Sequence, residues 1–366
     1  MALSKNNIDN SNRSIIFVTI SMTGGGTERV ISVLANYWAS HATDVTIVMI
    51  AGNEVAYDLN KNILVKNVSG ATGGDTRGRI ERIRRMREVF RANPDATVIA
   101  MGSVASMFTA VALLGLKNRL IVSERNDPGR LNYRPIKSYE KVLRNLLYHR
   151  ASNVVFQTDM AMELFSGAIR KRGIIIMNPV DENLPKPTGY EQRGKYIISA
   201  GRINKKKNLR LLVDAFSEFY KDHKDYKLLI YGEGEESKNI GQHICELGLN
   251  EAIIMKGFSH DLCGEMNQAR IFVSSSDSEG ISNSIVEAMA MGMVVIATDC
   301  PVGGSRMLID SGNNGILFGV GDKNELVEAL KRVMDINVAK RYSDKAIEVR
   351  TKYSVSEIIG NWERLI

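Results

Sequence analysis

The sequence SSDSEGISNSIVEAMAMGMVVIATD, residues 275–299, places one carboxylate in a loop of glycine and small polar residues and another shortly after it. An apolar run precedes the loop, and its composition predicts a strand over Ile271–Ser275. Asn283 or Ser284 is expected to cap the helix that follows, and Gly292 to end it. The next apolar run, VVIAT, predicts a second strand. The stretch therefore reads as a strand, a polar loop, a helix and a strand, which is the unit of a parallel sheet.

The same alternation of apolar runs and helical stretches extends through the chain. The predicted strands are Ile15–Ile20, Val45–Ile50, Val98–Met101, Leu120–Ser123, Val154–Gln157, Ile174–Met177, Tyr196–Ala200, Lys227–Tyr231, Ile253–Lys256, Ile271–Ser275 and Val294–Thr298. Near-continuous apolar strands with helical crossovers are typical of parallel sheets covered on both faces. We therefore predict an α/β protein with two doubly wound, Rossmann-like domains, at residues 1–178 and 195–351. The proline-rich residues 179–194 are expected to link them.

Composition is that of an ordinary globular protein of 366 residues, with 44% hydrophobic and 24% charged residues. The polar first fourteen residues and the short apolar runs predict neither a signal peptide nor a membrane span. Three scattered cysteines lack the spacing of a metal site and indicate a reducing compartment. These features predict a cytoplasmic protein without a metal site.

The net charge is +7, and arginine is concentrated in RGRIERIRRMREVFR, residues 77–91. Ile80, Ile83 and Met86 follow the spacing of an amphipathic helix, with arginine on the other face. This face is either a solvated surface or a site for anionic lipid headgroups or a diphosphate. The candidate residues for the second reading are Arg82, Arg84, Arg85 and Arg87. Nucleic acid is not expected, because no recognition helix or aromatic platform accompanies the charge.

Loops after several predicted strands combine glycines and bases. Gly24, Gly25 and Gly26 follow the first strand and would let backbone N–H groups approach a phosphate, although a tight turn also explains them. Arg202 and Lys205–Lys207 precede a helix that Asn208 is expected to cap. Because the helix dipole disfavours cations at that end, the cluster predicts an anionic ligand, most strongly for Arg202 and Lys207. A solvated basic loop is the alternative. Glycines that end two further strands and could let the backbone contact a base are Gly232, Gly234 and Gly257.

Glu279 and Glu287 lie on either side of the polar loop. Ser284 and Glu287 fit a capping box, which would explain one carboxylate but not the other. A ligand rich in hydroxyl groups and phosphate explains both, because carboxylates accept from paired hydroxyls and free N–H groups at a helix start bind anions. The candidate residues of this loop are Gly280, Ser282, Asn283 and Ser284. Ligands of parallel sheets sit outside the carboxyl ends of the strands, so the site is expected in a cleft between the two domains.

The segments Gly24–Arg29, Gly201–Asn208 and Asp277–Asp299, taken in this order, resemble the retaining glycosyltransferases of family GT4, which have the GT-B fold. The resemblance implies that Glu279 contacts the hydroxyls of a donor sugar and that Glu287 holds the ribose. It implies that Arg202 and Lys207 neutralise the diphosphate and that the Gly25–Gly26 loop closes over the donor. It also implies that a C-terminal helix, about residues 352–366, packs back on the first domain, which binds the acceptor.

One position departs from the family. Many relatives carry a histidine where VSERNDPGR, residues 122–130, has Arg125. Arg125 could contact sugar or phosphate, and Glu124 could bind acceptor hydroxyls or act as a base, or the two could only brace the loop. With Glu279 they are the candidate catalytic residues. The family resemblance suggests front-face substitution, and because the sequence contains no Asp-x-Asp triplet we expect no metal or other cofactor.

The resemblance predicts a glycosyltransferase that moves a sugar from a nucleotide-sugar, for which a UDP-sugar is expected, to a hydroxyl of a glycan acceptor in polysaccharide biosynthesis. Relatives with such basic helices suggest a polyprenyl-diphosphate-linked acceptor and peripheral attachment to the inner face of the cytoplasmic membrane. A nucleotide-sugar epimerase on the same fold and a non-catalytic scaffold are the alternatives.

Overall fold

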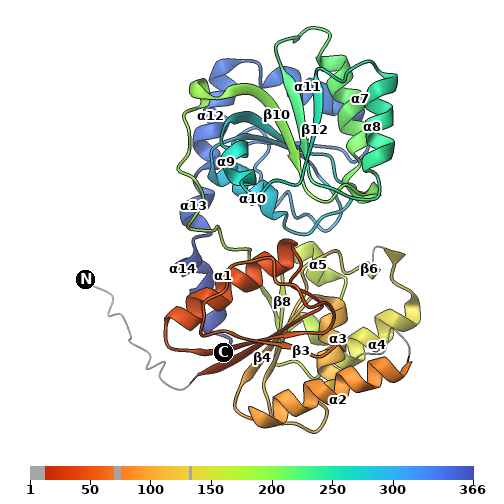
Figure 1. Cartoon of the computed structure of the whole chain (residues 1–366), viewed down its shortest axis with the longest axis vertical. Helices are drawn as coiled ribbons and strands as arrows, with labels where there is room; N and C mark the ends of the chain where they lie inside the picture. The colour runs from red at the N-terminus through yellow and green to blue at the C-terminus, as the bar shows by residue number, and fades with distance from the viewer. Residues whose placement is uncertain (1–12, 70–75, 132–133) are drawn as a thin grey trace, which may run out of the picture. The chain divides into compact units, whose positions relative to one another are not determined.

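The computed structural model describes residues 13–69, 76–131 and 134–366 (Figure 1). The chain divides into two compact units, which are described separately here. The first contains residues up to 156, then 162–176 and 359–366, and the second contains 157–161 and 177–358. Each unit has its own parallel sheet, which confirms the predicted α/β class with two doubly wound domains.

The first unit is built on seven parallel strands in the order β3-β2-β1-β4-β5-β8-β9. Their bounds are β1 (Ser14–Thr19), β2 (Asp44–Met49), β3 (Leu64–Asn67), β4 (Thr97–Met101), β5 (Leu120–Ser123), β8 (Asn153–Phe156) and β9 (Gly173–Ile175). The hairpin of β6 (Arg130–Leu131) and β7 (Arg134–Pro135) is separate. Strand order reverses between β1 and β4, so the loop after β1 lies at a topological switch point.

Helices cover both faces of the first sheet. They are α1 (Gly26–Ser40), α2 (Thr76–Ala92), α3 (Ser103–Ala112), α4 (Ser138–Tyr148) and α6 (Gly167–Arg170). Helix α5 (Asp159–Glu163) contains residues of both units, because residues 157–161 belong to the second. Successive strand residues point to opposite faces. Phe17 therefore meets Trp38 of α1, with ring centroids 5.8 Å apart, while Ile16 lies in the cluster that contains Met86 of α2. Figure 1 shows α1 and α2 on opposite sides of this sheet.

The second unit has six parallel strands in the order β12-β11-β10-β13-β14-β15. The strands are β10 (Gly194–Ala200), β11 (Lys227–Tyr231), β12 (Ile253–Gly257), β13 (Ala269–Ser274), β14 (Val294–Thr298) and β15 (Ile316–Phe318). The helices are η1 (Tyr190–Gln192), η2 (Lys205–Lys207), α7 (Leu209–Phe219), α8 (Ser237–Glu246), α9 (Leu262–Met266), α10 (Asn283–Ala290), α11 (Lys323–Arg332), α12 (Ile336–Ala346) and α13 (Val349–Lys352). Its switch point lies between β10 and β13.

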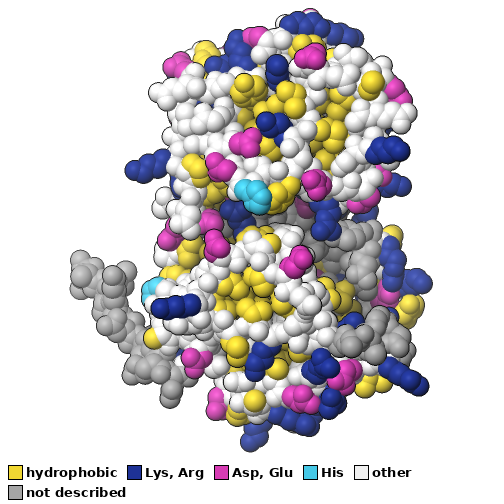
Figure 2. Space-filling model, viewed as in Figure 1, with side chains coloured by type: hydrophobic (Ala, Val, Ile, Leu, Met, Phe, Trp, Pro, Cys, Tyr) yellow, Lys and Arg dark blue, Asp and Glu magenta, His cyan; other side chains and the backbone are white. Residues whose placement is uncertain are grey.

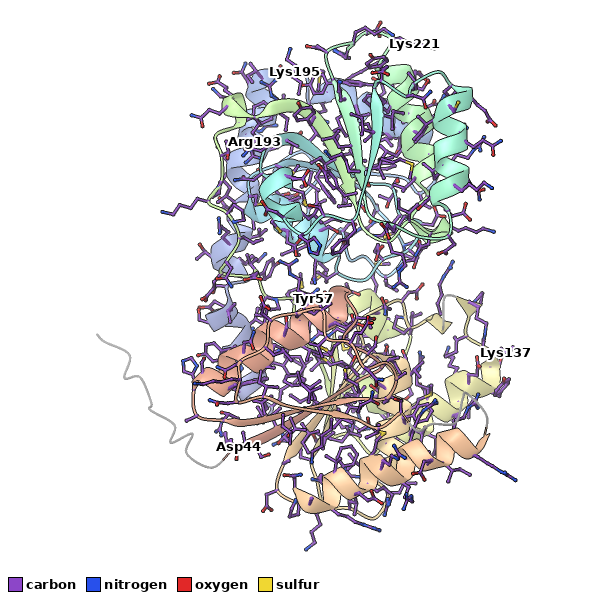
Figure 3. The ribbon with its side chains drawn as sticks, viewed as in Figure 1. Asp44, Tyr57, Lys137, Arg193, Lys195 and Lys221 are labelled. Carbon is purple, nitrogen blue, oxygen red and sulfur yellow. The ribbon has the colours of Figure 1, made fainter. Side chains whose placement is uncertain are left out.

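The chain passes between the two units through residues 177–194 and again through the C-terminal helix. Residues 177–194 pack within the second unit, where buried Arg193 donates to the carbonyls of Thr188 and Ala269 at 2.9 and 3.1 Å (Figure 3). Helix α14 (Val355–Glu363) passes from the second unit to the first, which holds residues 359–366. There Trp362 is fully buried, and the Arg125 guanidinium lies 5.7 Å from its ring centroid.

Candidate functional site

The loops that follow β10 and β13 lie side by side at the switch point of the second sheet. The backbone N–H of Asp277 donates to the Lys206 carbonyl at 2.8 Å, and the Ser275 hydroxyl donates to the Lys207 carbonyl at 2.9 Å. These bonds hold residues 204–208 against residues 275–279. The sequence predictions placed ligand contacts on both loops, and the structure brings the two loops together.

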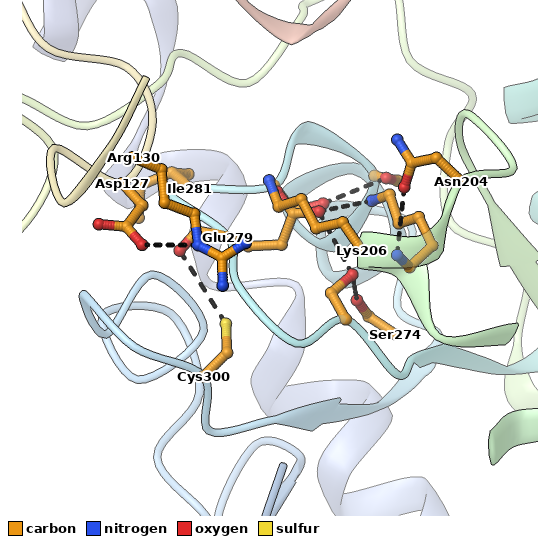
Figure 4. A network of polar contacts seen from close by, with 12 residues as sticks. Asp127, Arg130, Asn204, Lys206, Ser274, Glu279, Ile281 and Cys300 are labelled. Atoms are coloured by element: carbon orange, nitrogen blue, oxygen red, sulfur yellow. Dashed lines mark hydrogen bonds and ion pairs between the residues drawn. The ribbon is translucent and has the colours of Figure 1, made fainter. Parts of the chain in front are cut away.

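Glu279 lies between two lysines of this cluster (Figure 4). Its two carboxylate oxygens are 2.8 Å from Lys207 Nζ and 3.2 Å from Lys206 Nζ. The Ser276 hydroxyl also donates to the carboxylate, at 3.2 Å. The Glu279 side chain is only 13% exposed, and the lysines are 19% and 20% exposed. The three charged groups therefore interact with little screening by water.

The protonation state of Glu279 follows from this balance. Burial alone would raise the pKa of the carboxyl, but the positive charges of Lys207 and Lys206 outweigh it and lower the pKa to about 2. The group is therefore ionised at neutral pH. An ionised carboxylate accepts hydrogen bonds and is well suited to sugar hydroxyls, while the adjacent ammonium groups are suited to phosphate oxygens.

The lysines are positioned by a short 3-10 turn. The Asn204 side chain accepts from the Lys207 N–H at 3.2 Å, and Asn208 then adopts a left-handed conformation with φ of 44°. Asn208 is the N-cap residue of α7, as predicted, but its side chain donates to Asp277 at 2.8 Å rather than capping the helix. The anion that offsets the basic turn in this structure is therefore Glu279.

The remaining bases of the turn behave differently. Arg202 and Lys205 are exposed, and their side chains form no hydrogen bond or ion pair with other described residues. Lys206, which the sequence analysis ranked below Arg202, contacts Glu279 directly. No sequence pattern could assign these roles, because the direction of each lysine depends on the 3-10 turn and on the left-handed residue after it.

The predicted capping box is wrong. Helix α10 begins at Asn283 with Ser282 as its N-cap residue, so Glu287 lies in the second turn and cannot reach the N-cap backbone. The Ser284 hydroxyl instead donates to the Ala200 carbonyl, at 3.4 Å, which ties the helix start to the end of β10. Glu287 is 6% exposed, and its carboxylate lies 3.9 Å from Cys263 Sγ.

Two amides that the sequence analysis missed hold the loop before α10. Gln157 Oε1 accepts from the N–H of Ile281 at 3.1 Å, and its Nε2 donates to Asn178 Oδ1 at 2.8 Å. Asn178 in turn donates to the side chain of Asn283 at 2.5 Å. The Ile281 N–H and the Asn283 side chain thus already have partners within the protein. Ligand contact by Gly280, Ser282, Asn283 and Ser284 stays a prediction. No local signal marks these amides, which lie more than a hundred residues away in sequence.

The glycines after β11 have a packing role. A Cβ atom added to Gly232 would lie 2.0 Å from the Gly201 carbonyl oxygen, and one added to Gly234 would lie 2.1 Å from that of Ile203. The N–H of Gly232 donates to the Gly257 carbonyl at 2.8 Å. These glycines let neighbouring loops approach closely, and their predicted contact with a nucleobase stays a prediction.

The first unit carries the other predicted site residues. Gly25 is the N-cap residue of α1, and Gly26 is the first residue of that helix. The Tyr57 hydroxyl accepts from the Gly25 N–H at 2.9 Å and donates to its carbonyl at 2.7 Å (Figure 3). Tyr57 was missed, because a tyrosine between predicted elements has no distinctive pattern. It fixes the glycine loop and engages one of the N–H groups predicted to contact phosphate.

Glu124 and Arg125 are both buried, at 1% and 4% exposure. One Glu124 oxygen accepts from the Ser103 hydroxyl at 2.6 Å and the other from the Tyr148 hydroxyl. Burial lowers the pKa of Arg125 to about 9. Glu124 is thus held by hydroxyl groups of its own unit. Contact of Glu124 or Arg125 with substrate stays a prediction.

The arginines predicted to meet the acceptor lie on α2, and most have partners within the protein. Arg84 and Arg85 pair with Glu81 at 2.9 and 2.8 Å. Arg87 donates to the carbonyls of Ala112 and Leu114, both at 2.7 Å, and so caps the end of α3. Arg82 is half-buried, and its Nε has no partner among the described residues.

The described part of the chain also bears on metal binding and membrane insertion. Residues 13–69, 76–131 and 134–366 contain no cluster of three His, Cys, Asp or Glu residues able to hold a metal ion. In the same residues no helix combines the length and hydrophobicity that a membrane span requires.

The chain is similar in sequence to known proteins. Residues 180–349 match the family model described as "Glycosyl transferases group 1". An uncharacterised glycosyltransferase of Haemophilus influenzae is 24% identical, with 94% of this chain and 97% of that protein covered. The N-acetylgalactosamine-N,N'-diacetylbacillosaminyl-diphospho-undecaprenol 4-alpha-N-acetylgalactosaminyltransferase of Campylobacter jejuni is 30% identical over 64% of this chain and 66% of its own length.

The solved structures support the fold. HepE of Anabaena, in complex with UDP and glucose, superposes with a TM-score of 0.81 at 19% identity, covering 97% of this chain and 99% of that one. The predicted GT-B fold is thereby confirmed. On these matches residues 180–349 are similar in sequence to the group 1 glycosyltransferases, and the chain as a whole shares the fold of HepE.

Proposed function

We propose that the protein transfers a sugar from a UDP-sugar to a hydroxyl group of a glycan acceptor in polysaccharide biosynthesis, with retention of anomeric configuration. The observation that carries the proposal is Glu279 held between Lys206 and Lys207 at the switch point of the second sheet. It combines an acceptor for hydroxyl groups with two donors for phosphate in one cluster. UDP is favoured over other nucleotides because HepE, which shares the fold, was solved with UDP and glucose.

In the proposed donor complex, the basic side chains and the Glu279 carboxylate bind different parts of the nucleotide-sugar. The diphosphate binds Lys206, Lys207 and exposed Arg202, and the Glu279 carboxylate then accepts from hydroxyls of the sugar. Glu287 holds the ribose. Gly25 and Gly26 of the first unit stay predicted donor contacts.

The proposed reaction exchanges one bond at the anomeric carbon for another. The bond from the anomeric carbon to the diphosphate oxygen breaks, and a bond to the acceptor oxygen forms on the same face. The acceptor proton passes to the leaving phosphate oxygen, and the lysines stabilise the charge that develops on UDP. Glu279 is not a nucleophile in this scheme. We expect the reaction to continue in EDTA, because cationic side chains supply the charge that a divalent ion would otherwise provide.

The proposed acceptor is a sugar linked to polyprenyl diphosphate at the inner face of the membrane. The name of the Campylobacter relative specifies a diphospho-undecaprenol acceptor. In the present chain, α2 carries seven arginines against Glu81 and Glu88 and stays strongly basic despite its internal pairs. Arg82, Arg84, Arg85 and Arg87 are proposed to attract the anionic acceptor and membrane over a distance rather than to bind as a free cluster.

A panel of UDP- and GDP-sugars tests the donor. Each is added to the full chain, thermal unfolding is followed, and slow hydrolysis is then measured without acceptor. A UDP-sugar should raise the melting temperature and release its sugar with the original anomeric configuration. The Glu279→Gln variant should hydrolyse the donor more slowly, while Lys205→Ala, which changes an exposed lysine of the same turn, should resemble the wild type.

Three other results would contradict part or all of the proposed function. Conversion of the nucleotide-sugar to an isomer without acceptor would indicate an epimerase. Failure of every nucleotide-sugar to bind would indicate a scaffold protein. Equal transfer to free and to polyprenyl-diphosphate-linked sugars would exclude the lipid-linked acceptor but leave the donor assignment intact.

A further inference from the structure

Helix α4 (Ser138–Tyr148) buries two large side chains that carry polar groups. Arg144 and Tyr148 are fully buried. The Arg144 guanidinium donates to the Pro128 carbonyl at 2.6 Å and lies 4.2 Å from the ring centroid of Phe165. The Tyr148 hydroxyl donates to Glu124. The helix is therefore fixed to the first unit largely through polar groups.

The opposite face of α4 is apolar and exposed. Tyr139, Val142, Leu143 and Leu146 are 64%, 67%, 49% and 67% exposed. Their spacing of three, four and seven residues places them in one stripe along the helix. Four of the sixteen exposed large hydrophobic residues of the described chain thus lie on this one helix of eleven residues. Single exposed apolar residues are common, but a continuous stripe marks an interaction surface.

The charged residues around the stripe indicate what kind of partner could bind it. Lys137, Lys141 and His149 are exposed at or next to the helix. Its one acidic residue, Glu140, is paired with Arg134, and its side chain is only 14% exposed. In Figure 2, hydrophobic and basic side chains occur together along the lower right edge, where Figure 1 places α4. An apolar stripe beside cations, without an exposed acid on the helix, is complementary to an anionic bilayer.

A neighbouring helix adds to this charge. Helices α2 and α4 both pack against α3 in the first unit. Seven arginines against two glutamates make α2 strongly basic. The apolar stripe and the basic helix therefore belong to one layer of the same unit, where long-range attraction and shallow insertion can act together.

We propose that the apolar stripe of α4, formed by Tyr139, Val142, Leu143 and Leu146, inserts into the interfacial region of an anionic membrane. Lys137 and Lys141 contact lipid headgroups beside it, and α2 supplies the longer-range attraction. This inference rests on the proposed function for its biological setting, since a lipid-linked acceptor requires the enzyme at a membrane. The binding itself depends on neither donor nor transfer and can be measured without them.

Vesicle sedimentation tests the surface with the full chain. Vesicles of phosphatidylglycerol and phosphatidylcholine in equal parts are compared with phosphatidylcholine alone. The variant Tyr139→Ser/Val142→Asn/Leu143→Gln/Leu146→Gln should bind the anionic vesicles at least roughly ten-fold more weakly than the wild type. The matched control Leu247→Gln/Val320→Asn/Ile336→Gln removes exposed apolar side chains of the second unit and should bind like the wild type. Equal binding by the α4 variant would overturn the proposal.

A fluorescent side chain reports insertion directly. In Tyr139→Trp, tryptophan emission should shift to shorter wavelength with anionic vesicles and should be quenched by brominated acyl chains. Binding without quenching would place the contact elsewhere and overturn the proposal, as would failure of the wild type to bind. A dimer in analytical ultracentrifugation that the four-residue variant abolishes, without vesicle binding, would instead identify a second copy of the chain as the partner.

Activity assays separate this inference from the proposed function. Donor hydrolysis should be unchanged in the four-residue variant, and transfer to an acceptor presented in vesicles should fall. Loss of vesicle binding with normal hydrolysis supports the α4 surface. Normal vesicle binding by a protein that binds no nucleotide-sugar would overturn the proposed enzyme and leave the membrane surface standing.

Discussion

Lys207 Nζ lies 2.8 Å from Glu279 Oε1, so a cation suited to phosphate and a carboxylate suited to sugar hydroxyls bind each other directly. Lys206 approaches the other carboxylate oxygen at 3.2 Å. A diphosphate that binds these lysines competes with the carboxylate for them. Release of the carboxylate then makes its oxygens available to a sugar. Binding of the two parts of a nucleotide-sugar is expected to be coupled through these three side chains.

The variant Glu279→Gln should affect sugar transfer and diphosphate binding differently. Sugar transfer is expected to fall about a hundred-fold, because the sugar loses a charged acceptor that orients it for reaction. Affinity for UDP should not fall, because both lysines no longer have a carboxylate partner and still attract the diphosphate. Calorimetry with UDP and steady-state rates with the UDP-sugar measure these effects. A parallel loss of UDP affinity would show that the carboxylate chiefly positions the lysines.

Lys206→Ala and Lys207→Ala should each weaken UDP binding by about ten-fold, because each removes a charge-assisted hydrogen bond to phosphate. Uridine binding should not change, since uridine has no phosphate. Lys205→Ala is the matched control from the same turn and should leave UDP affinity near the wild-type value. If Lys205→Ala weakened UDP binding more than Lys206→Ala or Lys207→Ala, the assignment of diphosphate binding to Lys206 and Lys207 would be wrong.

The acidic limit of stability should depend on Glu279. Its pKa is about 2 in the folded protein against an ordinary 4.5, so the folded state favours the ionised carboxyl. The resulting stabilisation is complete above pH 4.5 and is lost as the pH falls towards 2. The difference in free energy of unfolding between wild type and Glu279→Gln should therefore be largest above pH 4.5 and shrink on acidification. Urea unfolding at several pH values measures it, and a pH-independent difference would contradict it.

The sequence was sufficient to predict the central strands, because their cores are continuous apolar runs. Leu120–Ser123, Lys227–Tyr231 and Val294–Thr298 occupy the predicted positions. Two edge strands were missed. Leu64–Asn67 is half-exposed with a lysine in it, and Ile316–Phe318 has only three residues, so neither has a pattern long enough to distinguish a strand from a loop.

The sequence placed candidate residues on loops that the structure brings together, but it did not predict contacts made by side chains that reach across the fold. The topology of parallel sheets brings the loops after β10 and β13 together, so Glu279 and the basic turn could be placed in one site. Gln157 and Tyr57 could not be found in this way. Each binds the backbone of a distant loop, and that contact depends on packing that the local sequence does not encode.

Tyr148→Phe tests whether Glu124 braces the fold. The Tyr148 hydroxyl donates to the buried Glu124 carboxylate, while burial and that carboxylate raise the tyrosine pKa well above its ordinary value and keep it protonated. Removal of the hydroxyl should destabilise the protein by about 1–3 kcal/mol, because a buried carboxyl oxygen loses its donor. Tyr139→Phe, at an exposed position of the same helix, is the control and should cost little.

Measurements of kcat distinguish a Glu124 that braces the loop from a Glu124 that acts as a base. If the carboxylate braces the loop, Tyr148→Phe should keep the wild-type rate and pH profile under conditions where it is folded. If the carboxylate acts as a base, loss of its hydrogen bond should shift the pH dependence of kcat. Measurement of kcat across the stable pH range decides between them.

Gly232→Ala should show whether the loop after β11 is required for packing. A Cβ atom would lie 2.0 Å from the Gly201 carbonyl oxygen, and the φ of 120° is unfavourable for alanine. Because backbone must move to relieve the contact, we expect a loss of at least about 3 kcal/mol. Gly241→Ala in α8, where the nearest atom is Met255 Sδ at 3.7 Å, is the control and should stabilise the protein by up to about 1 kcal/mol. A Gly232→Ala protein that unfolds like the wild type but no longer binds UDP would show that this glycine contacts the nucleotide instead.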